Sequence, residues 1–342
     1  MFERNVYDSY QLYCDSRFSI GDYEAFEANG QSYIILPKEE CASNELEMIA
    51  YIDYMRSIGD TSILELQQTV QKGYVGLVDG QDVYVCKLTA ESSRQGFRLQ
   101  SDFQRGEHLA AIHYYGKQMP TKQKNFDYFG QWHRLWEKRL EQLEGWYQQV
   151  LYEGPQSIVD EAFLFSYPYF MGLTENAIQY AVDANLDDKS KEQEQGTISH
   201  RRFTEKTWLI LSEYGDFVKR PTDFVYDHRC RDIAEWIRSK RDQLLDEGWS
   251  GITDFLEGYE QYEPLSSFAW RMTYARLLFP LHYFETIESY YRSQLPDEKN
   301  VYGQAFFQLL EKEQLNQQFL EQFLNQIQLQ RTVGMTQKVD WL

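Results

Sequence analysis

Histidine and cysteine are the residue types in this chain that could carry nucleophilic or metal chemistry. Among His113, His133, His200 and His228, no two have the i, i+4 or short-loop spacing that a metal site requires. The four cysteines are scattered and form no Cys-x-x-Cys pair: Cys14, Cys41, Cys86 and Cys230. We therefore expect structural histidines, free thiols in a reducing compartment and no metal site.

Missing motifs disfavour several enzyme classes. The chain has no Gly-x-Ser-x-Gly elbow, Walker loop or Cys/His nucleophile signature, and its acidic residues do not pair into recognisable glycosidase carboxylates. One polar segment, 198–232, contains His200, Asp223, Asp227 and Asp232. Carboxylates at suitable positions hold Mg²⁺ and orient a hydroxyl for phosphoryl transfer. This segment is therefore the candidate site for phosphoryl transfer.

The overall charge of the chain restricts its partners. Asp and Glu number 53 against 34 Lys and Arg, which gives a formal net charge of -19. Such a surface repels nucleic acid and anionic membranes, so we expect neither as a partner. The stretch from Met1 to Tyr10 is charged, and no later stretch reaches eighteen uninterrupted apolar residues, so we expect synthesis in the cytoplasm.

The first ninety residues have the pattern of strands around one helix. Asn29-Gly30 and Asp79-Gly80 each separate two apolar runs, as in two-residue β-hairpins. Between them, Asn44 and Glu47 form a capping box, and Leu46, Ile49, Ile52 and Met55 are expected to form the apolar helix face that ends before Gly59. The sequence predicts a five-stranded antiparallel sheet plus one helix.

The remaining residues are mainly helical in pattern. Helices are expected at 132–150, 158–165 and 174–184, with a break at Pro168, and later at 233–245, 252–262, 266–292 and 302–328. A small β-hairpin is expected within 207–218, with its turn at Tyr214-Gly-Asp. The fold class is therefore α+β and bilobal, with a β-rich N-lobe at 1–95 and a helical C-lobe at 96–342 that contains 198–232.

Three segments give this order of elements a resemblance to a known fold. They are Ile198-Ser-His200, the predicted hairpin from Trp208 to Val218, and Val225-Tyr-Asp-His-Arg-Cys-Arg-Asp-Ile-Ala-Glu-Trp236. They resemble the catalytic loop, the hairpin and the loop-anchoring helix of the aminoglycoside phosphotransferase and choline kinase branch of the protein-kinase-like superfamily. The resemblance covers nearly the whole chain and implies a kinase-like fold.

The residues that this resemblance assigns to catalysis have the wrong types. Counting forward from His200, the catalytic aspartate position falls on Arg202 and the metal-binding asparagine position on Thr207; counting back from Asp232, the second metal-binding aspartate falls on Arg220. A guanidinium only donates hydrogen bonds and repels a cation. If three residues are deleted in the alignment, Asp223 takes the metal-binding role.

The N-terminal half departs from the kinase pattern as well. The run Ser19-Ile-Gly-Asp-Tyr is no glycine-rich phosphate loop, and the lysine expected at the end of the third strand falls at Pro37 or Lys38. Weak candidates for nucleotide binding are Lys38, Glu45, Glu47 and Lys87. A pairing of Lys38 with Glu45 or Glu47 is one interpretation, and solvated surface charges are the other, which we favour.

Two helical motifs indicate a particular family within this branch. Leu109-Ala-Ala-Ile-His113 and Trp132-His-Arg-Leu-Trp-Glu-Lys-Arg-Leu140 resemble helices of the spore coat YutH and CotS-related family. The resemblance implies a coat component made in the cytoplasm of the sporulating mother cell and deposited in the spore coat, with other coat proteins as partners. It also implies structural anchoring of the loop by Asp227 and Asp232.

Two functions remain open from the sequence. The first is a catalytically degenerate kinase-like protein, or pseudokinase, with no bound metal or nucleotide and with coat proteins as partners. The second is an active ATP-dependent phosphotransferase that uses ATP and Mg²⁺, with Asp223 as metal ligand and His200 or Glu205 near the substrate. In either case the cleft between the lobes is a candidate place for a small-molecule ligand.

Overall fold

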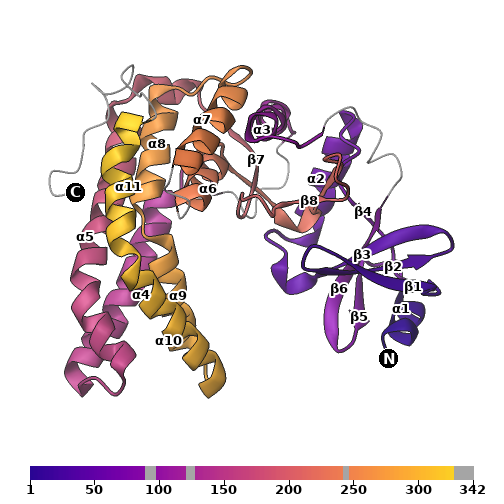
Figure 1. Ribbon diagram of the computed structural model, residues 1–342, viewed down its shortest axis with the longest axis horizontal. Helices are drawn as coiled ribbons and strands as arrows, with labels where there is room; N and C mark the ends of the chain where they lie inside the picture. The colour runs from indigo at the N-terminus through magenta and orange to yellow at the C-terminus, as the bar shows by residue number, and fades with distance from the viewer. Residues whose placement is uncertain (89–97, 121–127, 242–245, 327–342) are drawn as a thin grey trace. The chain divides into compact units, whose positions relative to one another are not determined.

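A computed structural model describes residues 1–88, 98–120, 128–241 and 246–326. It has the predicted α+β architecture, with a small antiparallel sheet in the N-terminal region and a larger helical C-terminal region (Figure 1). Helices account for 59% of the residues that the structure describes. None of its described helices is long and apolar enough to cross a membrane.

Both hairpins predicted in the first ninety residues are confirmed. Strands β2 (Tyr23–Ala28) and β3 (Gln31–Pro37) pair across Asn29-Gly30, where φ is 54° and 69°. Strands β5 (Val75–Val78) and β6 (Gln81–Leu88) pair across Asp79-Gly80, where φ is 47° and 85°. Positive φ at both central residues is what a type I′ turn needs, and Asn, Asp and Gly tolerate it best.

The sheet has six strands, so the prediction of five strands and one helix was wrong. The order is β1-β2-β3-β6-β4, and β5 also pairs with β6. Strand β1 (Ser16–Ile20) was missed because its side chains are mostly exposed and show no alternation of burial; pairing with β2 holds it. The other outer strand, β4, is only Glu65–Leu66.

The N-terminal helix α1 (Phe2–Tyr10) was also not predicted from the sequence. It buries Phe2, Val6 and Tyr10 at a spacing of four residues against the sheet face that carries Phe26 and Tyr33. The Phe2 and Phe26 rings meet edge to face, with centroids 6.0 Å apart. One face of the sheet is therefore covered by the chain's own first ten residues.

Helix α2 (Glu45–Ser57) begins where it was predicted to begin. The Asn44 side chain accepts a hydrogen bond from the Glu47 backbone N–H at 2.9 Å, which confirms the cap. The predicted apolar face was partly wrong, because Leu46 is 66% exposed. The buried positions include Met48, Tyr51, Ile52 and Met55, so the second half of the predicted face is confirmed and its first half is replaced by Met48 and Tyr51.

The other α-helices have the following bounds. They are α3 (Asp102–Gly116), α4 (Trp132–Glu153), α5 (Ile158–Asp187), α6 (Cys230–Lys240), α7 (Asp246–Glu260), α8 (Ser267–Leu278), α9 (Leu281–Arg292), α10 (Pro296–Glu311) and α11 (Glu313–Gln326). Short 3₁₀ helices occupy Lys38–Glu40 (η1), Lys189–Gln193 (η2) and Pro221–Asp223 (η3).

Three predicted helix boundaries were wrong. Helix α5 runs through Pro168 without a break, because Pro168 is exposed and the turns on both sides of it bury core side chains. The predicted helix 266–292 is two helices, since Pro280 has no backbone N–H to continue α8. The predicted helix 302–328 divides at Lys312, where no glycine or proline signals a break.

Two short strand pairs lie among the helices. The pair β8 (Trp208–Ile210) and β9 (Phe217–Lys219) is the predicted hairpin, with Gly215 at φ 84° in its turn. The pair β7 (Gly196–His200) and β10 (Phe224–His228) was not predicted. Both of its strands are largely buried, so neither shows alternation in the sequence.

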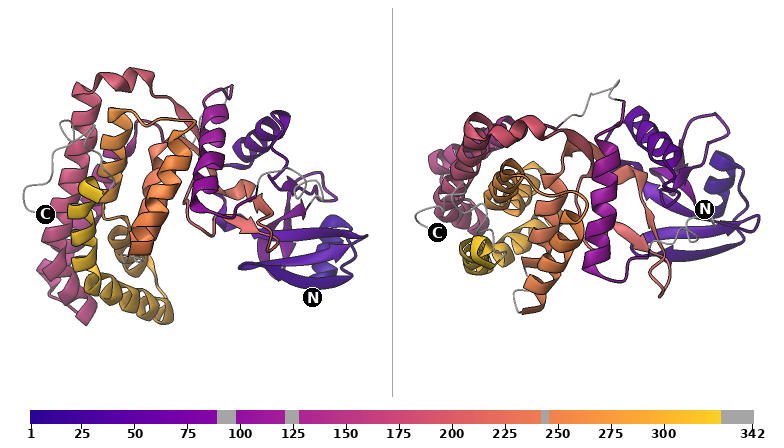
Figure 2. Two further views of the ribbon diagram at one scale, coloured as in Figure 1. Left: turned by 45° about the horizontal axis from the view of Figure 1, so that its top comes forward. Right: turned by 90° about the horizontal axis from the view of Figure 1, so that it is seen from above.

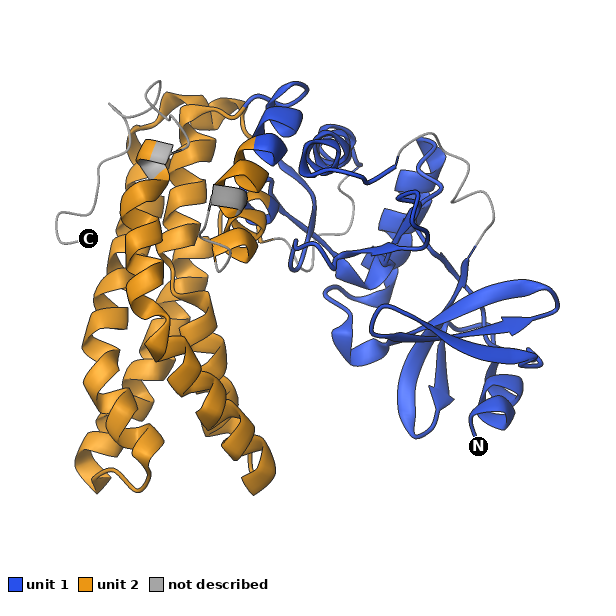
Figure 3. Cartoon of the chain, viewed as in Figure 1, with its two compact units in different colours: residues 1–127, 195–232, 254–264 blue, residues 128–194, 233–253, 265–342 orange. Residues whose placement is uncertain are grey.

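The contacts divide the chain into two compact units (Figure 3). Unit 1 comprises 1–127, 195–232 and 254–264, and unit 2 comprises 128–194, 233–253 and 265–342. Within unit 2, α5 packs against both α4 and α8, and the long helices of this unit are seen together in Figures 1 and 2. The predicted lobe boundary near residue 95 lies outside the described residues, so the division at 95 stays a prediction.

Candidate functional site

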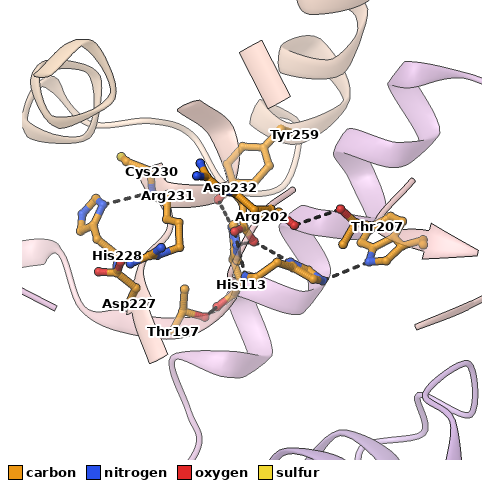
Figure 4. A network of polar contacts seen from close by, with 12 residues as sticks. His113, Thr197, Arg202, Thr207, Asp227, His228, Cys230, Arg231, Asp232 and Tyr259 are labelled. Atoms are coloured by element: carbon orange, nitrogen blue, oxygen red, sulfur yellow. Dashed lines mark hydrogen bonds and ion pairs between the residues drawn. The ribbon is translucent and has the colours of Figure 1, made fainter. Parts of the chain in front are cut away.

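Asp232 is at the centre of a buried polar network in unit 1 (Figure 4). It lies in the first turn of α6, and its Oδ1 accepts the backbone N–H of His200 at 2.8 Å. Its Oδ2 is 2.8 Å from His200 Nδ1. The pairing of β7 with β10 places His200 opposite Phe224. One carboxylate thus holds both the backbone and the ring of the histidine that ends β7.

A second histidine completes the network. His113 Nε2, from α3, lies 3.1 Å from Asp232 Oδ2, and His113 Nδ1 lies 2.8 Å from the Tyr259 hydroxyl of α7. Thr197 Oγ1 donates to the His113 carbonyl at 2.8 Å. Burial acts to raise the pKa of Asp232, but the two histidines outweigh it and lower that pKa to about 2. The carboxylate therefore stays charged and holds the loop.

Both ring nitrogens of His200 are engaged. Trp208 Nε1 donates to His200 Nε2 at 3.0 Å, so the proton of the neutral ring is on Nδ1 and points at Asp232. The imidazole is 1% exposed. In this arrangement His200 serves as a structural bridge between Asp232 and Trp208.

Thr207 and Arg202 close the loop that follows β7. Thr207 Oγ1 donates to the Arg202 carbonyl at 2.9 Å (Figure 4). It also accepts the Thr204 N–H at 2.8 Å. Thr207 is buried, whereas Arg202 is only partly so, and Glu205 between them is exposed. At the predicted position of a metal-binding asparagine, the hydroxyl of Thr207 is thus used to fix its own loop.

Arg220 lies in a cluster of four side chains from unit 1, which we call the Arg220 cluster: Tyr23, Glu40, Arg220 and Asp223. Arg220 Nη2 is 2.6 Å from Asp223 Oδ2, and Nη1 is 3.8 Å from Glu40 Oε2. The guanidinium carbon lies 4.8 Å from the centre of the Tyr23 ring. Tyr23 in turn donates its hydroxyl proton to Glu40 at 2.7 Å. The cluster joins β2, η1 and η3.

The carboxylate of Asp223, the alternative metal ligand, pairs with Arg220 within this cluster. Burial raises the pKa of Asp223 to about 6, while Arg220 and His200 act to lower it. Because this pKa is still below neutrality, the carboxylate is charged at pH 7 and pairs with the guanidinium. The Asp223 carbonyl also accepts the Arg201 N–H at 2.7 Å, so the backbone is fixed too.

The weak N-terminal candidates do not come together with one another. Lys38 pairs with Asp82 at 3.0 Å, and both side chains are about half exposed. Of the two glutamates in the first turn of α2, Glu47 is buried and Glu45 is partly exposed. Lys87 lies in β6 opposite Tyr33 and Glu65. Among the described residues, Lys38 therefore pairs with Asp82 rather than with either glutamate.

Asp227 is buried and locally paired. Its Oδ2 accepts from Arg231 Nε at 2.5 Å, and its Oδ1 accepts the His228 N–H at 2.7 Å. His228 Nδ1 accepts the Cys230 N–H at 3.2 Å, which fixes the start of α6 (Figure 4). Asp227 thus stabilises the connection from β10 to α6, the connection that leads to Asp232.

The sequence did not reveal a buried ion pair between Lys219 and Asp60. Lys219 is fully buried at the end of β9, and its ammonium pairs with Asp60. Burial and the nearby Lys219 lower the pKa of His108 to about 3. The Asp60 carboxylate also accepts the Ser62 N–H at 3.1 Å. This Asx turn had a readable signal in Asp60-Thr-Ser62, whereas Lys219 in an apolar strand had none.

The residues present do not fit the nucleotide-bound Mg²⁺ that the fold would imply. Arg202 and Arg220 occupy predicted carboxylate positions, and Asp223 pairs with Arg220. The described part of the chain has no group of three or more His, Cys, Asp and Glu side chains that could hold a metal ion.

The family model described as spore coat putative kinase YutH matches residues 3–323. This chain belongs to the YutH spore coat family. The endospore coat-associated protein YutH of Bacillus subtilis strain 168 is 33% identical over 325 residues, which cover 94% of this chain and 91% of that relative. The resemblance predicted from the two helical motifs is thereby confirmed.

Solved structures similar to this member of the YutH family show its fold. An aminoglycoside phosphotransferase from Alicyclobacillus acidocaldarius has a TM-score of 0.60 at 13% identity and covers 92% of this chain and 93% of its own. A microcompartment-associated aminopropanol kinase has a TM-score of 0.57 at 12% identity, with 91% and 92% covered. The kinase-like fold is thus shared over about nine-tenths of the chain.

Proposed function

We propose that this YutH-family protein is a pseudokinase that acts as a structural component of the spore coat and binds other coat proteins. The observation that carries the proposal is the Arg220 cluster. Its guanidinium is 2.6 Å from the carboxylate of Asp223, the best remaining candidate for a metal ligand. A guanidinium paired with this carboxylate competes with a bound cation for the same oxygens.

Electrostatics support this interpretation. Two like charges about 4 Å apart repel by about 4 kcal/mol at an effective dielectric constant near 20. Mg²⁺ carries two charges, so at the Asp223 carboxylate it would be repelled about twice as strongly by Arg220. Arg220 is only 12% exposed and is held by Glu40 as well. His200, the other candidate for the active interpretation, has both ring nitrogens engaged.

The coat role rests on the family. The Bacillus subtilis relative is described as endospore coat-associated, and we extend that location, with synthesis in the mother cell, to this chain. Large apolar side chains such as Phe165 (91% exposed) and Tyr152 (93% exposed) offer contact area to partner proteins. We also propose that the β-rich N-lobe ends at residue 95 and that the helical C-lobe begins at residue 96.

The enzymatic half of the proposal is tested by thermal unfolding with ATP or ADP, with and without Mg²⁺. A ligand that binds only the native state raises the melting temperature at saturating concentration. We expect no shift with Mg²⁺ and ATP together. A rise of several degrees that Asp223→Asn abolishes would support the active phosphotransferase, and a rise with ATP alone that Arg220→Met abolishes would support metal-free nucleotide binding.

The coat half is tested in cells. A fluorescent fusion of this chain, expressed in sporulating Bacillus subtilis that lacks its own YutH, should form a ring around the developing spore. Fluorescence that stays diffuse in the mother cell would contradict the proposed location. Asp223→Asn should form the same ring, because the proposed coat role does not need a metal ligand at that position.

A further inference from the structure

Helix α5 carries apolar side chains on two opposite faces. The inner face packs against α4 and α8 and buries Phe163 and Phe170. The outer face holds Ile158, Phe165 and Leu186, which are 70%, 91% and 80% exposed. In Figures 1 and 2, α5 lies along the outside of the helices of unit 2. A surface helix normally has a polar outer face, and a helix that is apolar all round is normally covered on every side. The outer face of α5 is therefore of the kind that a partner covers.

The exposed side chains of this outer face form one stripe along the helix. At about 100° per residue they fall within a sector about 100° wide, and from Ile158 to Leu186 the stripe is about 42 Å long. We call the apolar and acidic members of this sector the α5 stripe: Ile158, Glu161, Phe165, Pro168, Glu175 and Leu186. A long, narrow stripe of this kind fits a second helix lying alongside, because the side chains of two packed helices interdigitate along such rows.

The stripe belongs to a part of the chain that has no basic residues. Between Arg139 and Lys189 the sequence contains nine Asp and Glu residues and no Lys, Arg or His. This part covers most of α4 and the whole of α5. The local charge is therefore strongly negative, even for a chain whose net charge is -19.

The glutamates along these two helices keep their negative charge without a basic partner. Within the residues that the structure describes, Glu144 of α4 and Glu161 and Glu175 of the stripe form no ion pair. Burial, followed by Glu144 and Glu175, raises the pKa of the Tyr167 hydroxyl, so the charges of both helices act on one side chain. Asp187, at the end of α5, instead pairs with an arginine of α8. The middle of the stripe is thus both apolar and negatively charged.

Charge complementarity decides between the possible occupants of the stripe. A second copy that met the stripe through its own stripe would bring like charges together, and an anionic membrane would be repelled in the same way. A segment with Lys and Arg beside apolar residues satisfies both kinds of stripe residue, since long basic side chains extend their charged ends past an apolar contact. A helix of that composition also matches the shape of the stripe.

We propose that the α5 stripe is a docking surface for a basic amphipathic helix of a partner protein. Apolar side chains of that helix pack on Ile158, Phe165 and Leu186, and the Lys or Arg side chains beside them pair with Glu161 and Glu175. The inference names the chemistry of a partner for the proposed coat role, and it rests on that role for the place where the two proteins meet. Peptide binding is measured without spores, so the two proposals fail separately.

Fluorescence anisotropy on the full chain tests the proposal with three labelled peptides of 21 residues, each about 30 Å long as a helix. The first has Leu at heptad positions a and d and Lys elsewhere, the second has Glu in place of every Lys, and the third has the composition of the first in an order that breaks the apolar face. We expect saturable binding of the first peptide, at least about tenfold tighter than that of the other two. Its affinity should fall as sodium chloride rises from about 50 to 300 mM.

The apolar half of the stripe is tested with Phe165→Ser. This change removes the most exposed apolar side chain of the stripe and should weaken binding of the basic amphipathic peptide about tenfold, as the loss of an aromatic anchor does. Leu46→Ser is the matched control, since Leu46 is an exposed apolar residue of a helix in unit 1. It should bind the peptide as the parent protein does.

The acidic half is tested with the double variant Glu161→Gln and Glu175→Gln. It should weaken binding and make the remaining affinity less sensitive to salt, because two charge pairs are lost. The matched control is Glu39→Gln with Glu213→Gln, which removes two exposed glutamates from unit 1. Both double variants have the same net charge, so a difference between them locates the binding on α5.

Four outcomes would overturn the proposal. The first two are no saturable binding of the basic amphipathic peptide and equal affinity for the peptide with the broken apolar face. The third is unchanged affinity in both Phe165→Ser and the double variant of Glu161 and Glu175. The fourth is a dimer in sedimentation, or binding to zwitterionic vesicles, that Phe165→Ser abolishes, which would assign the stripe to a second copy or a membrane. Circular dichroism melts of each variant separate a loss of binding from a loss of folding.

Discussion

The carboxylate of Asp223 is subject to two opposing influences. Burial favours its protonated form and raises its pKa to about 6, whereas Arg220 favours its charged form. A carboxylate whose pKa is higher in the folded state than its ordinary value of about 3.9 stabilises the fold fully below pH 4. That contribution is lost as the pH rises through 6, because the unfolded chain releases its proton first.

Replacement of Asp223 by asparagine should remove this pH dependence. Between pH 4 and pH 6.5, the free energy of unfolding of the parent protein should fall relative to Asp223→Asn by roughly 2 to 3 kcal/mol, since one pKa unit corresponds to about 1.4 kcal/mol. Urea unfolding at several pH values measures the difference. Asp53→Asn, on the exposed side of α2, is the matched control, and an identical pH profile for both variants would refute the assignment.

At the scale of elements, α3 and α7 cross through two glycines. A Cβ on Gly106 would lie 2.0 Å from the Phe255 carbonyl oxygen, and one on Gly258 would lie 2.1 Å from the Phe103 carbonyl oxygen. The two helices also carry His113 and Tyr259, which hydrogen bond to each other. The close crossing therefore sets the position of the network around Asp232.

Gly106→Ala should separate these helices and destabilise the protein by about 3 kcal/mol or more, because the added methyl group meets backbone atoms that cannot rotate away. Gly145→Ala is the matched control in α4, where a Cβ has no neighbour within 4 Å. There the change should stabilise the protein by about 0.5 to 1 kcal/mol. Equal effects in denaturant unfolding would refute the crossing geometry.

Local signals predicted the elements that depend on local chemistry. The Asn29-Gly30 and Asp79-Gly80 turns and the Asn44 cap were all readable, since each depends on one or two residues. Strands β7 and β10 were not, because a strand buried on both faces shows no alternation. Pro168 misled the prediction of α5, because packing on both sides of the proline outweighed one lost hydrogen bond.

Local spacing in the sequence suggested a candidate segment but none of its long-range contacts. Counting from His200 and Asp232 led to Arg202, Thr207 and Arg220, and the structure places these residues as described. No sequence pattern indicated that Glu40 and Tyr23 would meet Arg220, because these residues are about 180 to 200 positions away along the chain. Long-range partners follow from the fold and not from local spacing.

At the scale of the whole molecule, the net charge of -19 opposes the compact state through self-repulsion. Salt screens such repulsion, since the Debye length falls from about 30 Å at 0.01 M to about 8 Å at 0.15 M. The net effect of salt on stability depends on two terms: this repulsion, and the attraction within surface ion pairs, which salt also weakens. Exposed pairs contribute little, so we expect the repulsion to dominate.

The melting temperature should therefore rise by a few degrees as sodium chloride increases from 10 to 300 mM at pH 7. At pH 5, close to the isoelectric point of about 4.8, the same salt series should have a much smaller effect. Differential scanning calorimetry at both pH values measures this. A melting temperature that falls with salt at pH 7 would mean that ion pairs outweigh the repulsion.

The Arg220 cluster has a consequence for how the protein ages. A divalent cation or a nucleotide is lost when its concentration falls, but a guanidinium attached to the chain cannot diffuse away. Under the proposed function, the integrity of this region depends on no metabolite and no energy supply. A protein built in this way keeps its shape after the cell that made it has stopped working.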